Sequence, residues 1–230
     1  MVKISVIMPV LNEAGAVPLS LASLQPARRA GHELIVVDGG SSDASAEIAS
    51  RYADRVLSAP ASRAGQMNEG ARRATGELLL FLHADTLLPD GWFEYVEAAH
   101  AESGQWGWFD VCLDNPAWVY RLIAACMNRR ARVTKVCTGD QAMFLRRELF
   151  DQVGGFPPQP LMEDVALSKR LRRLGRPRVI AERVVTASRR WEARGVASTI
   201  LLMWDLRLRY FLGQSPESLH ARYYPRREES

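Results

Sequence analysis

Four short, almost uninterrupted apolar runs constrain the fold of this chain more than any other feature of its sequence. They span residues 3–8, 33–38, 55–58 and 77–82, and helix-like segments lie between them. Apolar runs of this length are typical of strands that are buried on both faces of a parallel sheet. The alternation of strand and helix predicts an α/β fold, in which helices flank a mostly parallel, Rossmann-like central sheet.

Three segments between these strands have the composition of helices. We expect helices over 14–24, 43–52 and 63–75, and the polar residues 41–43 are suited to cap the second of them. Strand and helix then follow each other as they do in βαβ units. The first hundred residues are therefore expected to form one continuous sheet with its covering helices.

The carboxyl ends of the predicted strands carry polar side chains that suit a ligand site. These ends read PVLNE at 9–13, DGGSSD at 38–43 and HAD at 83–85. In open α/β sheets, ligands bind in the crevice outside the carboxyl ends of the strands. We therefore expect the functional site at this edge of the sheet.

The same loops exclude two common nucleotide-binding designs. No GxGxxG follows the first strand, and no GxxxxGK[ST] loop occurs in the chain. Asp38 ends the second strand, where a carboxylate can accept a hydrogen bond from a ribose or a base. A bound nucleoside diphosphate would then need a neutralising group other than a glycine-rich helix start. A divalent metal held by Asp85, with the help of Arg side chains, is the simplest candidate.

Length and composition are those of one ordinary globular domain, with 230 residues, 47% hydrophobic and 24% charged. The longest apolar runs, such as 78–82 and 200–204, are far shorter than the ~18–20 residues of a membrane-spanning helix. The cysteines Cys112, Cys126 and Cys137 have no metal-site spacing and fit free thiols in a reducing compartment. With no leader-type cleavage site near the N-terminus, these features predict a cytoplasmic protein.

Positive charge gathers in the second part of the chain. Residues 101–230 carry 22 Lys and Arg against 14 Asp and Glu, whereas residues 1–100 carry 8 against 12. Nearly all the cations are Arg, which reflects either codon usage or guanidinium groups that face a phosphate-bearing partner. The basic clusters lack the interleaved aromatic residues of a nucleic-acid surface. We therefore expect no nucleic-acid partner.

Five motifs, taken in this order, resemble those of family 2 glycosyltransferases of the GT-A fold. They are PVLNE, VVDGGSSD, FLHADT, TGDQ at 138–141 and MEDVALS at 162–168. The resemblance covers residues 3–192. The late Arg-Arg-Trp at 189–191 is similar to that of small soluble bacterial members that also carry HAD.

The resemblance implies an enzyme that moves a sugar from a UDP- or GDP-linked donor to an acceptor hydroxyl, assisted by Mn²⁺ or Mg²⁺. A single GT-A domain would fill residues 1–230, with a C-terminal elaboration on the acceptor side that ends in an apolar helix. Along the chain we expect a nucleotide-binding half at 1–103, an acceptor-side half at 104–195, the apolar helix at 196–214 and a flexible tail at 215–230.

The matching motifs also imply roles for single residues. Asp164 matches the catalytic base, with Glu163 beside it, and Asp85 matches the metal-binding end of the D-x-D motif. On the nucleotide side the matching residues are Pro9, Asn12, Glu13, Asp38, Gly40, Arg63, Gly65, Asn68 and Ala84. On the acceptor and diphosphate side they are Gly139, Asp140, Gln141, Arg190 and Trp191.

One position departs from the family pattern, because His83 stands where D-x-D begins with Asp. A neutral imidazole can ligate a metal, but the site then has one formal negative charge fewer. Two interpretations of His83 stay open. It is either a metal ligand beside Asp85 or a hydrogen-bonded histidine at a strand end.

Sugar transfer needs a cation for the leaving diphosphate and a base for the acceptor hydroxyl. Asp85 and Asp164 can supply these two functions separately, because a metal-bound carboxylate is a poor proton acceptor. No nucleophilic triad is evident, so we expect direct displacement with inversion. The alternatives are a sugar nucleotidyltransferase, which would carry a glycine-rich basic loop after the first strand, and a non-catalytic nucleotide-sugar-binding protein.

The segment 196–212 is strongly apolar and carries Trp204, Tyr210 and Phe211 among arginines. One interpretation is a helix that packs on the sheet or on a second copy of the chain, as in a homodimer. The other is an interfacial helix that docks on the inner face of a membrane and presents a lipid-linked acceptor. The Arg-rich tail at 215–230 is expected to fray.

Overall fold

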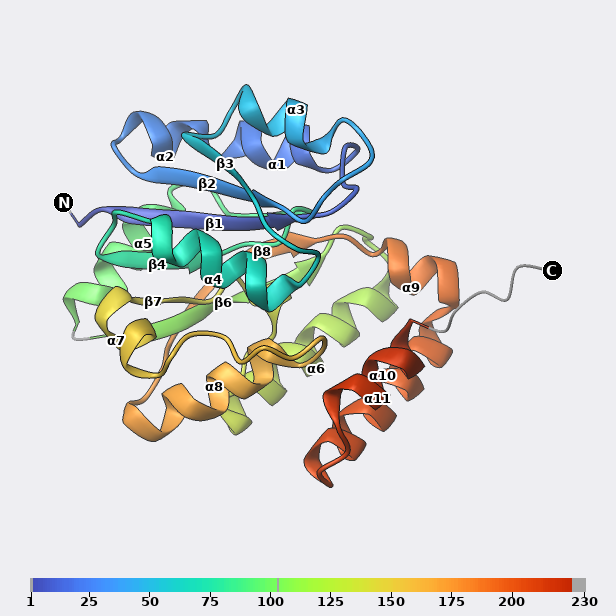
Figure 1. The fold of residues 1–230 in the computed structure, drawn as a ribbon. Helices are drawn as coiled ribbons and strands as arrows, with labels where there is room; N and C mark the ends of the chain where they lie inside the picture. Colours follow the sequence, from blue (N-terminus) through green and yellow to red (C-terminus); the bar gives the residue numbers. More distant parts are fainter. Residues whose placement is uncertain (1, 103, 225–230) are drawn as a thin grey trace.

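The computed structural model describes residues 2–102 and 104–224, which form one eight-stranded sheet with helices on both faces (Figure 1). Neighbouring strands follow the order β3-β2-β1-β4-β7-β6-β8-β5. The strands are β1 Ile4–Val10, β2 Glu33–Asp38, β3 Arg55–Ser58, β4 Leu78–Phe81, β5 Thr86–Leu87, β6 Trp106–Leu113, β7 Phe144–Arg146 and β8 Arg178–Thr186.

The sheet is parallel through its first half and mixed through its second. Strands β3, β2, β1 and β4 are parallel neighbours, as the alternation of strand and helix predicts. Beyond β4, the short strand β7 pairs antiparallel with both β4 and β6, β6 is parallel to β8, and β8 is antiparallel to β5. Strand and helix still alternate from β5 to β8, so the alternation along the chain does not by itself show which pairings are antiparallel.

Helices and short helical turns connect the strands and cover the sheet (Figure 1). The helices α1 to α3 lie along one side of β1 and β2, and α4, α7 and α8 lie on the other. The elements are α1 Val17–Ser23, α2 Gln25–Arg29, α3 Ser45–Ser50, α4 Arg63–Arg73, α5 Trp92–Ala101, α6 Trp118–Thr134, the 3₁₀ turn η1 Gly139–Gln141, α7 Arg147–Gln152, α8 Glu163–Leu174, α9 Arg189–Arg194, α10 Val196–Phe211 and α11 Pro216–Tyr223.

Most of the apolar runs of the sequence are buried on both faces of the sheet. In β1, Ile4, Val6 and Met8 belong to the core under α1, α2 and α5, whereas Ile7 belongs to the core under α4, α7 and α8. Successive side chains of a strand point to opposite faces, so a strand between two cores must be apolar throughout. This is the physical reason for the runs that form β1, β2 and β4. The expectation of burial on both faces is wrong for the run at 55–58, because β3 stands at the edge of the sheet and its residues are exposed or half-buried.

Two helices begin later in the sequence than predicted. The predicted helix at 14–24 begins as α1 at Val17, because the carbonyl of Glu13 accepts the N–H groups of Ala16 and Val17 in a turn. The predicted helix at 43–52 begins as α3 at Ser45, after a turn in which Asp43 accepts the N–H of Ser45. Asp43 therefore orders the loop before the helix, and the expectation that residues 41–43 cap it directly is wrong.

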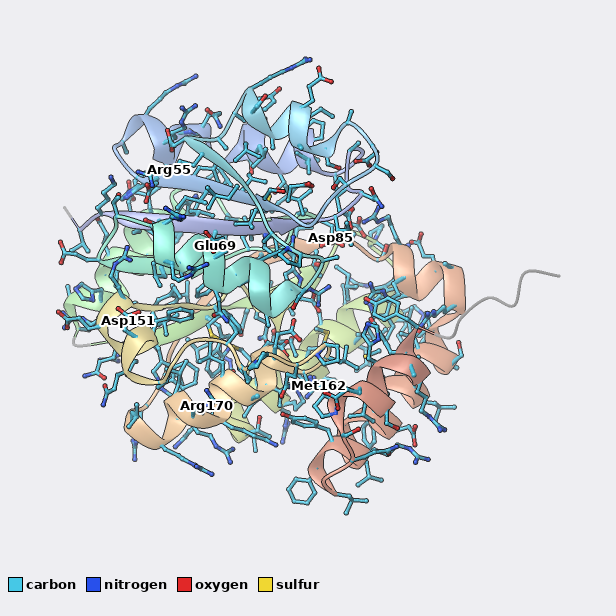
Figure 2. The ribbon with its side chains drawn as sticks, viewed as in Figure 1. Arg55, Glu69, Asp85, Asp151, Met162 and Arg170 are labelled. Atoms are coloured by element: carbon cyan, nitrogen blue, oxygen red, sulfur yellow. The ribbon has the colours of Figure 1, made fainter. Side chains whose placement is uncertain are left out.

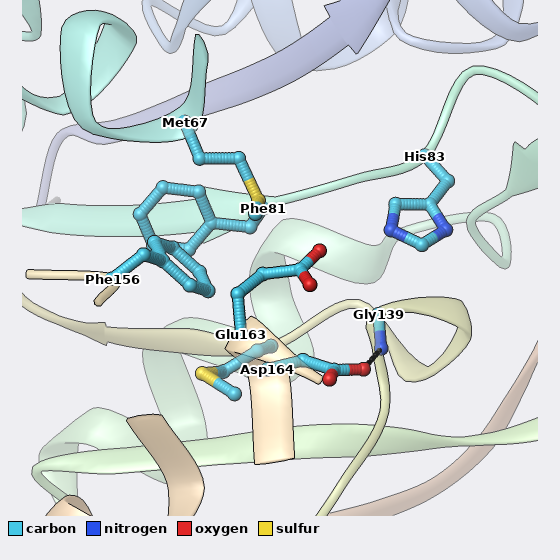
Figure 3. Close-up of a pocket in the computed structure, with 8 residues that line it drawn as sticks. Met67, Phe81, His83, Gly139, Phe156, Glu163 and Asp164 are labelled. Atoms are coloured by element: carbon cyan, nitrogen blue, oxygen red, sulfur yellow. Dashed lines mark hydrogen bonds between the residues drawn. The ribbon is translucent and has the colours of Figure 1, made fainter. Parts of the chain in front are cut away.

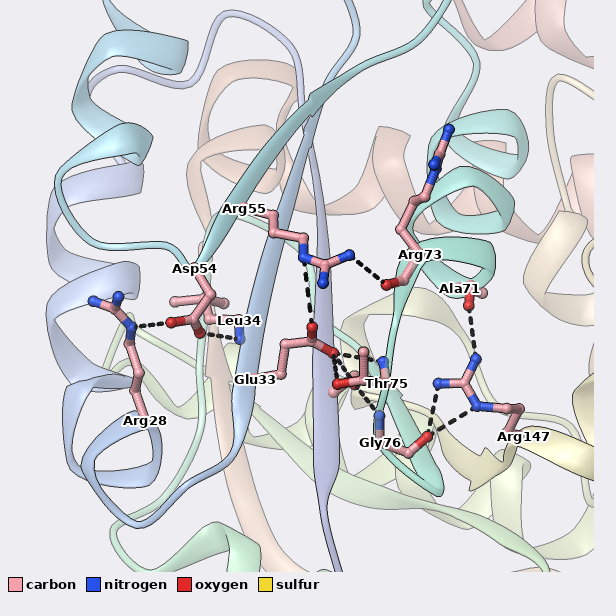
Figure 4. A network of polar contacts seen from close by, with 11 residues as sticks. Arg28, Glu33, Leu34, Asp54, Arg55, Ala71, Arg73, Thr75, Gly76 and Arg147 are labelled. Atoms are coloured by element: carbon pink, nitrogen blue, oxygen red, sulfur yellow. Dashed lines mark hydrogen bonds and ion pairs between the residues drawn. The ribbon is translucent and has the colours of Figure 1, made fainter.

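A buried carboxylate ties the start of β2 to its neighbours (Figure 4). Glu33 is 6% exposed, and its Oε2 atom accepts hydrogen bonds from the hydroxyl of Ser5 at 2.6 Å and from the N–H of Thr75 at 2.7 Å. The hydroxyl of Ser5 in turn accepts the N–H of Gly76 at 2.8 Å. The guanidinium of Arg55 lies 3.8 Å from the other carboxylate oxygen. Glu33 thus joins β1, β2 and the turn that leads into β4.

The chain does not end in the apolar helix that the sequence predicts. That helix is present as α10, but α11 follows it and packs along it, so residues 216–223 do not fray as expected. Ser215 caps α11 by accepting the N–H of Ser218, and Leu219 and Tyr223, four residues apart, are buried against α10. The expected flexibility of 225–230 lies outside the described residues. No helix in the described part of the chain is long and apolar enough to cross a bilayer.

Candidate functional site

An open groove of ≈ 860 Å³ runs along the carboxyl ends of β1 and β4, where ligands of open α/β sheets bind. The starts of α4 and α8, the turn η1 and parts of α9, α10 and α11 complete its walls. Asp85 and Met162 both line it, and Figure 2 labels Asp85 above Met162. Of the candidate residues, the groove is lined by Pro9, Glu13, Arg63, His83, Ala84, Asp85, Gly139, Asp140, Glu163, Asp164, Arg190 and Trp191.

Two other candidates, Asp38 and Asn12, hold loops beside the groove. The carboxylate of Asp38, 7% exposed, accepts the N–H groups of Gly40 and Ser41, each at 3.0 Å, and the hydroxyl of Ser41 at 2.5 Å. Gly40 has a φ of +90°, which an L side chain rarely adopts. Asn12 accepts the N–H of Ser42 at 2.8 Å and donates its own N–H to Ser41. The loops after β1 and β2 are therefore joined before any ligand binds.

Three further candidates support the walls instead of lining them. Asn68 exchanges two hydrogen bonds of 2.9 Å with the backbone of Phe156 and so fixes the loop between α7 and α8 on α4. Gly65 donates its N–H to the N-cap side chain at the start of α4. Gln141 is fully buried and accepts the N–H of Thr138, which closes the turn η1.

The acidic pair of the MED motif begins α8 and faces the groove (Figure 3). The carboxylate of Asp164 accepts the N–H of Gly139 at 2.7 Å and the N–H of Val165 at 2.7 Å. Glu163 is only 3% exposed, and one of its oxygens lies 3.6 Å from the guanidinium of Arg63. Burial and then the charge of Asp164 raise the pKa of Glu163 above its ordinary value, against the opposing charge of Arg63.

Backbone geometry at Met162 sets the direction in which this pair points. Met162 has a φ of +65°, although it is not glycine, and it directly precedes Glu163 at the N-terminus of α8. A left-handed residue costs of order 1–3 kcal/mol and is retained where the surrounding structure requires it. The left-handed residue lies where the preceding loop ends and α8 begins, and it lines the groove together with the acidic pair.

The imidazole of His83 lies over Gly139, in the pocket that the acidic pair also lines (Figure 3). Its Nδ1 atom is 3.3 Å from a carboxylate oxygen of Asp140, and its Nε2 atom is buried without a partner. A Cβ atom on residue 139 would stand 2.2 Å from that Nε2 atom, so the motif requires glycine there. Burial opposes ionisation of Asp140, but the hydrogen bond and charge of His83 lower the pKa of Asp140 to about 2.

Where the loops after β1 and β4 line the groove, Asp85 and Glu13 share one arginine. The guanidinium of Arg189 lies 3.0 Å from Glu13 and 3.6 Å from Asp85. Among the described residues, no three His, Cys, Asp or Glu side chains are grouped closely enough to hold a metal ion. Mg²⁺ is usually bound by one or two carboxylates together with substrate phosphates and water. Asp85, 31% exposed and facing the groove, fits that type of site.

Sequence reasoning missed several residues that the groove contains. Gln66 of α4 is buried and donates to the backbone carbonyls of Val10 and Val37, which joins the ends of β1 and β2. Arg189 was visible in the Arg-Arg-Trp motif, but the motif does not show which arginine faces Asp85. Arg207 lines the groove from α10, within an apolar segment that gives no sign of a site.

Comparison with known proteins relates this arrangement to sugar transfer. Part of the chain is 38% identical, over 91 residues, to a PGL/p-HBAD biosynthesis glycosyltransferase of Mycobacterium bovis, which covers 36% of each protein. The chain therefore spans about a third of the length of that curated relative.

Solved structures of glycosyltransferases share the fold at low identity. The mannosyltransferase PcManGT from Pyrobaculum calidifontis, in complex with GDP-Man and Mn²⁺, has a TM-score of 0.61 and 23% identity, over 80% of this chain and 56% of that one. S. aureus TarS in complex with UDP-GlcNAc gives 0.65 and 19%, over 80% and 58%. Glucosyl-3-phosphoglycerate synthase from Mycobacterium tuberculosis, with Mn²⁺, UDP and glucosyl-3-phosphoglycerate, gives 0.60 and 20%, over 80% and 71%.

These likenesses show the GT-A fold, with its central sheet and flanking helices. The family model for glycosyl transferase family 2 matches residues 5–154, which include the strands β1 to β4 and the loops at their carboxyl ends. Motifs, fold and family model agree, and the chain belongs to glycosyl transferase family 2.

Proposed function

We propose that this glycosyltransferase moves a sugar from a nucleoside-diphosphate donor to an acceptor hydroxyl with inversion, and that Asp164 is the general base. The observation that carries the proposal is the placement of Asp164 in the groove, where two backbone N–H groups fix its carboxylate. A base must lie within hydrogen-bond reach of the proton that it removes. A carboxylate fixed by the backbone can hold that position without help from the substrate.

The neighbouring acids are less suited to this role. Glu163 is almost fully buried beside Arg63, so its access to an acceptor is restricted. Asp140 has a pKa of about 2, which makes it a weak proton acceptor. Base efficiency rises as the pKa approaches the working pH. The raised pKa of Glu163 would favour it by this criterion, but its burial against Arg63 restricts its access to an acceptor. We therefore assign proton transfer to Asp164, with Glu163 as the nearest alternative.

We place the donor at the opposite end of the groove, beside Pro9, Glu13, Ala84 and Asp85. The relatives of known structure carry GDP-Man or UDP with Mn²⁺, which supports a UDP- or GDP-linked donor here. In this arrangement Asp85 would hold the Mn²⁺ or Mg²⁺, with the donor phosphates as further ligands, and His83 remains a second candidate ligand. When bound, the cation stabilises charge on the leaving diphosphate.

The residues of the chain account for the other steps. Arg189 lies at the donor end and can neutralise phosphate charge, and the Asp38 loop keeps the nucleoside edge of the groove in one conformation. Arg190 contacts the hydroxyl of Tyr223, and both residues line the groove. With Trp191 they form a wall that can exclude water from the reacting carbon. Inversion follows if the acceptor hydroxyl attacks directly as Asp164 removes its proton.

The outer face of α10 is a candidate surface for a binding partner. Leu201, Trp204, Leu208 and Phe211 are between 59% and 78% exposed and follow each other at helical spacing. An apolar face with arginines around it is typical of helices that lie in a membrane interface. We propose that this face rests on an anionic membrane surface, which would suit a lipid-linked acceptor and a cytoplasmic location at the inner face of a membrane. A second copy of the chain is the alternative occupant.

The proposed function can be tested with a panel of UDP- and GDP-linked sugars. Thermal shift and donor hydrolysis, each with and without Mn²⁺ or Mg²⁺, would identify the donor and the metal requirement. The anomeric configuration of the product, read by NMR, would show whether transfer inverts. Sugar-1-phosphate consumption with nucleoside triphosphate would instead support a nucleotidyltransferase. Binding of a nucleotide sugar without turnover on any acceptor would support a non-catalytic binding protein.

A further inference from the structure

Both ring nitrogens of His83 face protein atoms instead of the open groove. Nδ1 lies 3.3 Å from a carboxylate oxygen of Asp140, and the whole side chain is only 15% exposed. Nε2 is shielded from solvent, and within residues 2–102 and 104–224 it has no hydrogen-bond partner. A metal ion binds histidine through a nitrogen lone pair that it can reach. His83 therefore does not present a nitrogen to a cation in the groove, whereas Asp85, 31% exposed, presents its carboxylate.

The contact with Asp140 sets the direction of one hydrogen bond. The pKa of Asp140 is about 2, so its carboxylate is ionised at neutral pH and can only accept. Nδ1 then carries the hydrogen and donates it to Asp140. An aspartate at position 83 could not replace this bond, because two carboxylates would face each other and repel. The need for a donor beside Asp140 gives a physical reason for histidine where the D-x-D pattern begins with Asp.

The same histidine packs on the residue that holds the proposed base. Gly139 and Asp140 begin the turn η1, and Gly139 donates its N–H to Asp164 at 2.7 Å. The imidazole lies so close to Gly139 that a Cβ atom there would stand 2.2 Å from Nε2. Figure 3 shows the ring above Gly139 and the dashed bond from Gly139 to Asp164. His83 thus touches both residues that place this N–H, and through it one oxygen of Asp164.

The turn can form without His83, which separates positioning from folding. Gln141 is fully buried, its side chain accepts the N–H of Thr138 at 3.2 Å, and its own N–H donates to the carbonyl of Thr138 at 2.9 Å. These bonds close η1 from within. His83 reaches the turn from the loop after β4, so its contacts fix where η1 lies relative to that loop and to Asp164. Loss of these contacts should shift the turn without unfolding the chain.

We propose that His83 is a positioning residue for the catalytic base and not a metal ligand. Its contacts with Asp140 and Gly139 keep η1 where the N–H of Gly139 meets Asp164. The inference rests on the proposed function, because it takes Asp164 to be the base. It divides the HAD motif between two tasks: Asp85 serves the donor phosphates and their cation, and His83 joins the same loop to the acceptor side.

The variants His83→Asn and His83→Gln separate the two nitrogens. The amide nitrogen of Asn takes the place of Nδ1 and can donate to Asp140, whereas that of Gln corresponds to Nε2. At saturating donor and acceptor, His83→Asn should transfer sugar within about threefold of the wild-type rate. His83→Gln should lose at least about tenfold in kcat, with the KM for the donor changed less than about twofold, because a misplaced base affects the transition state alone. Equal loss in both variants, or in neither, would overturn the proposal.

A second histidine supplies the matched control. His100 is half-buried, contacts Arg146 and does not line the groove, so His100→Gln should leave kcat and KM unchanged. Melting temperatures are compared first, and all three variants should melt as the wild type does, since η1 is closed by its own bonds.

Binding of Mn²⁺ decides between positioning and ligation. It is measured by electron paramagnetic resonance on the full chain saturated with UDP or GDP. Both His83 variants should bind Mn²⁺ within about twofold of the wild type, whereas Asp85→Asn should bind it at least about tenfold more weakly. A loss of about tenfold or more in His83→Gln would make His83 a ligand and overturn the proposal.

Amide exchange at Gly139 reports the positioning without turnover. In protein with ¹⁵N-labelled glycine, NMR follows each of the 16 glycine amides. The N–H of Gly139 should exchange as slowly in His83→Asn as in the wild type, and at least about tenfold faster in His83→Gln. Equal protection in all three proteins would refute the positioning role and leave transfer by Asp164 untouched. Exchange that depends on residue 83, in a wild type that transfers no sugar, would instead reject Asp164 as the base while the contact stands.

Discussion

Replacing Glu33 by Gln would test whether one buried carboxylate joins the start of the sheet. The charged Oε2 atom accepts hydrogen bonds from Ser5 and from the N–H and hydroxyl of Thr75, at 2.6, 2.7 and 3.1 Å. A neutral amide keeps the shape but loses the charge. Hydrogen bonds to a charged group contribute ~1.5–3 kcal/mol each, against ~1 for neutral ones. With three such bonds, we expect the free energy of unfolding to fall by about 2–4 kcal/mol at pH 7.

The effect should depend on pH in a defined direction. Burial opposes ionisation of Glu33, but the hydrogen bonds from Ser5 and Thr75 lower its folded-state pKa below the ordinary value of 4.5. Ionisation therefore stabilises the folded protein. This contribution is fully present above pH 4.5, and it is lost as the pH falls through the folded-state pKa. Wild type and Glu33→Gln should converge in stability in acid.

Chemical denaturation at a series of pH values between neutral and acid would measure both proteins. Glu47→Gln is the matched control, because Glu47 is 69% exposed and pairs with Arg51 on the surface of α3. That change should alter stability by less than about 0.5 kcal/mol. A difference between wild type and Glu33→Gln that stays constant from neutral to acid pH would refute the reasoning.

Three other substitutions test the packing and the site. Gly70→Ala places a Cβ atom 2.4 Å from a side chain of β1 and should lower the free energy of unfolding by ~1–3 kcal/mol in chemical denaturation. Gly15→Ala is the control: its Cβ atom would stand in open space, and the free energy of unfolding should not change. Gly139→Ala should displace the ring of His83 and reduce transfer more than nucleotide affinity; unchanged transfer would contradict this packing. Asp38→Asn should weaken nucleotide binding, measured by calorimetry, because an amide cannot accept all the hydrogen bonds that the loop donates to the carboxylate. An unchanged dissociation constant would reject a role for Asp38 in nucleotide binding.

The first half of the fold could be predicted from the sequence because its signals are local. The strands β2 and β3 begin and end where the predicted runs do. In β2 all six residues are buried, as expected of a strand between two cores, whereas β3 is an edge strand whose end residues are exposed. The strands β5 and β7 have only two and three residues, too few for any periodic pattern, and depend on pairing with distant strands. The sequence predicts a flexible tail where α11 forms, because the polar residues of this segment outnumber Leu219 and Tyr223, the two buried residues that anchor it.

The candidate site could be predicted as a region more reliably than residue by residue. Parallel strands bring their carboxyl ends to one edge, so the motifs after β1 and β4 had to meet there. Whether a polar residue faces the ligand or a neighbouring loop depends on the folding of loops distant in the sequence. Asp38 binds the backbone of its own turn, and Asn68 of α4 binds the backbone of Phe156.

The rate of sugar transfer by Asp164→Asn, at saturating donor and acceptor, tests the central claim most directly. Only one oxygen of the amide can accept the N–H groups that Asp164 now satisfies, so folding is first checked by thermal melting. If Asp164 is the base, transfer should fall at least about a hundredfold while nucleotide affinity stays within about twofold of wild type. Glu163→Gln is the control and should keep most of its activity. An Asp164→Asn protein that transfers sugar at the wild-type rate would contradict the mechanism, and loss of transfer in Glu163→Gln alone would move the base by one residue.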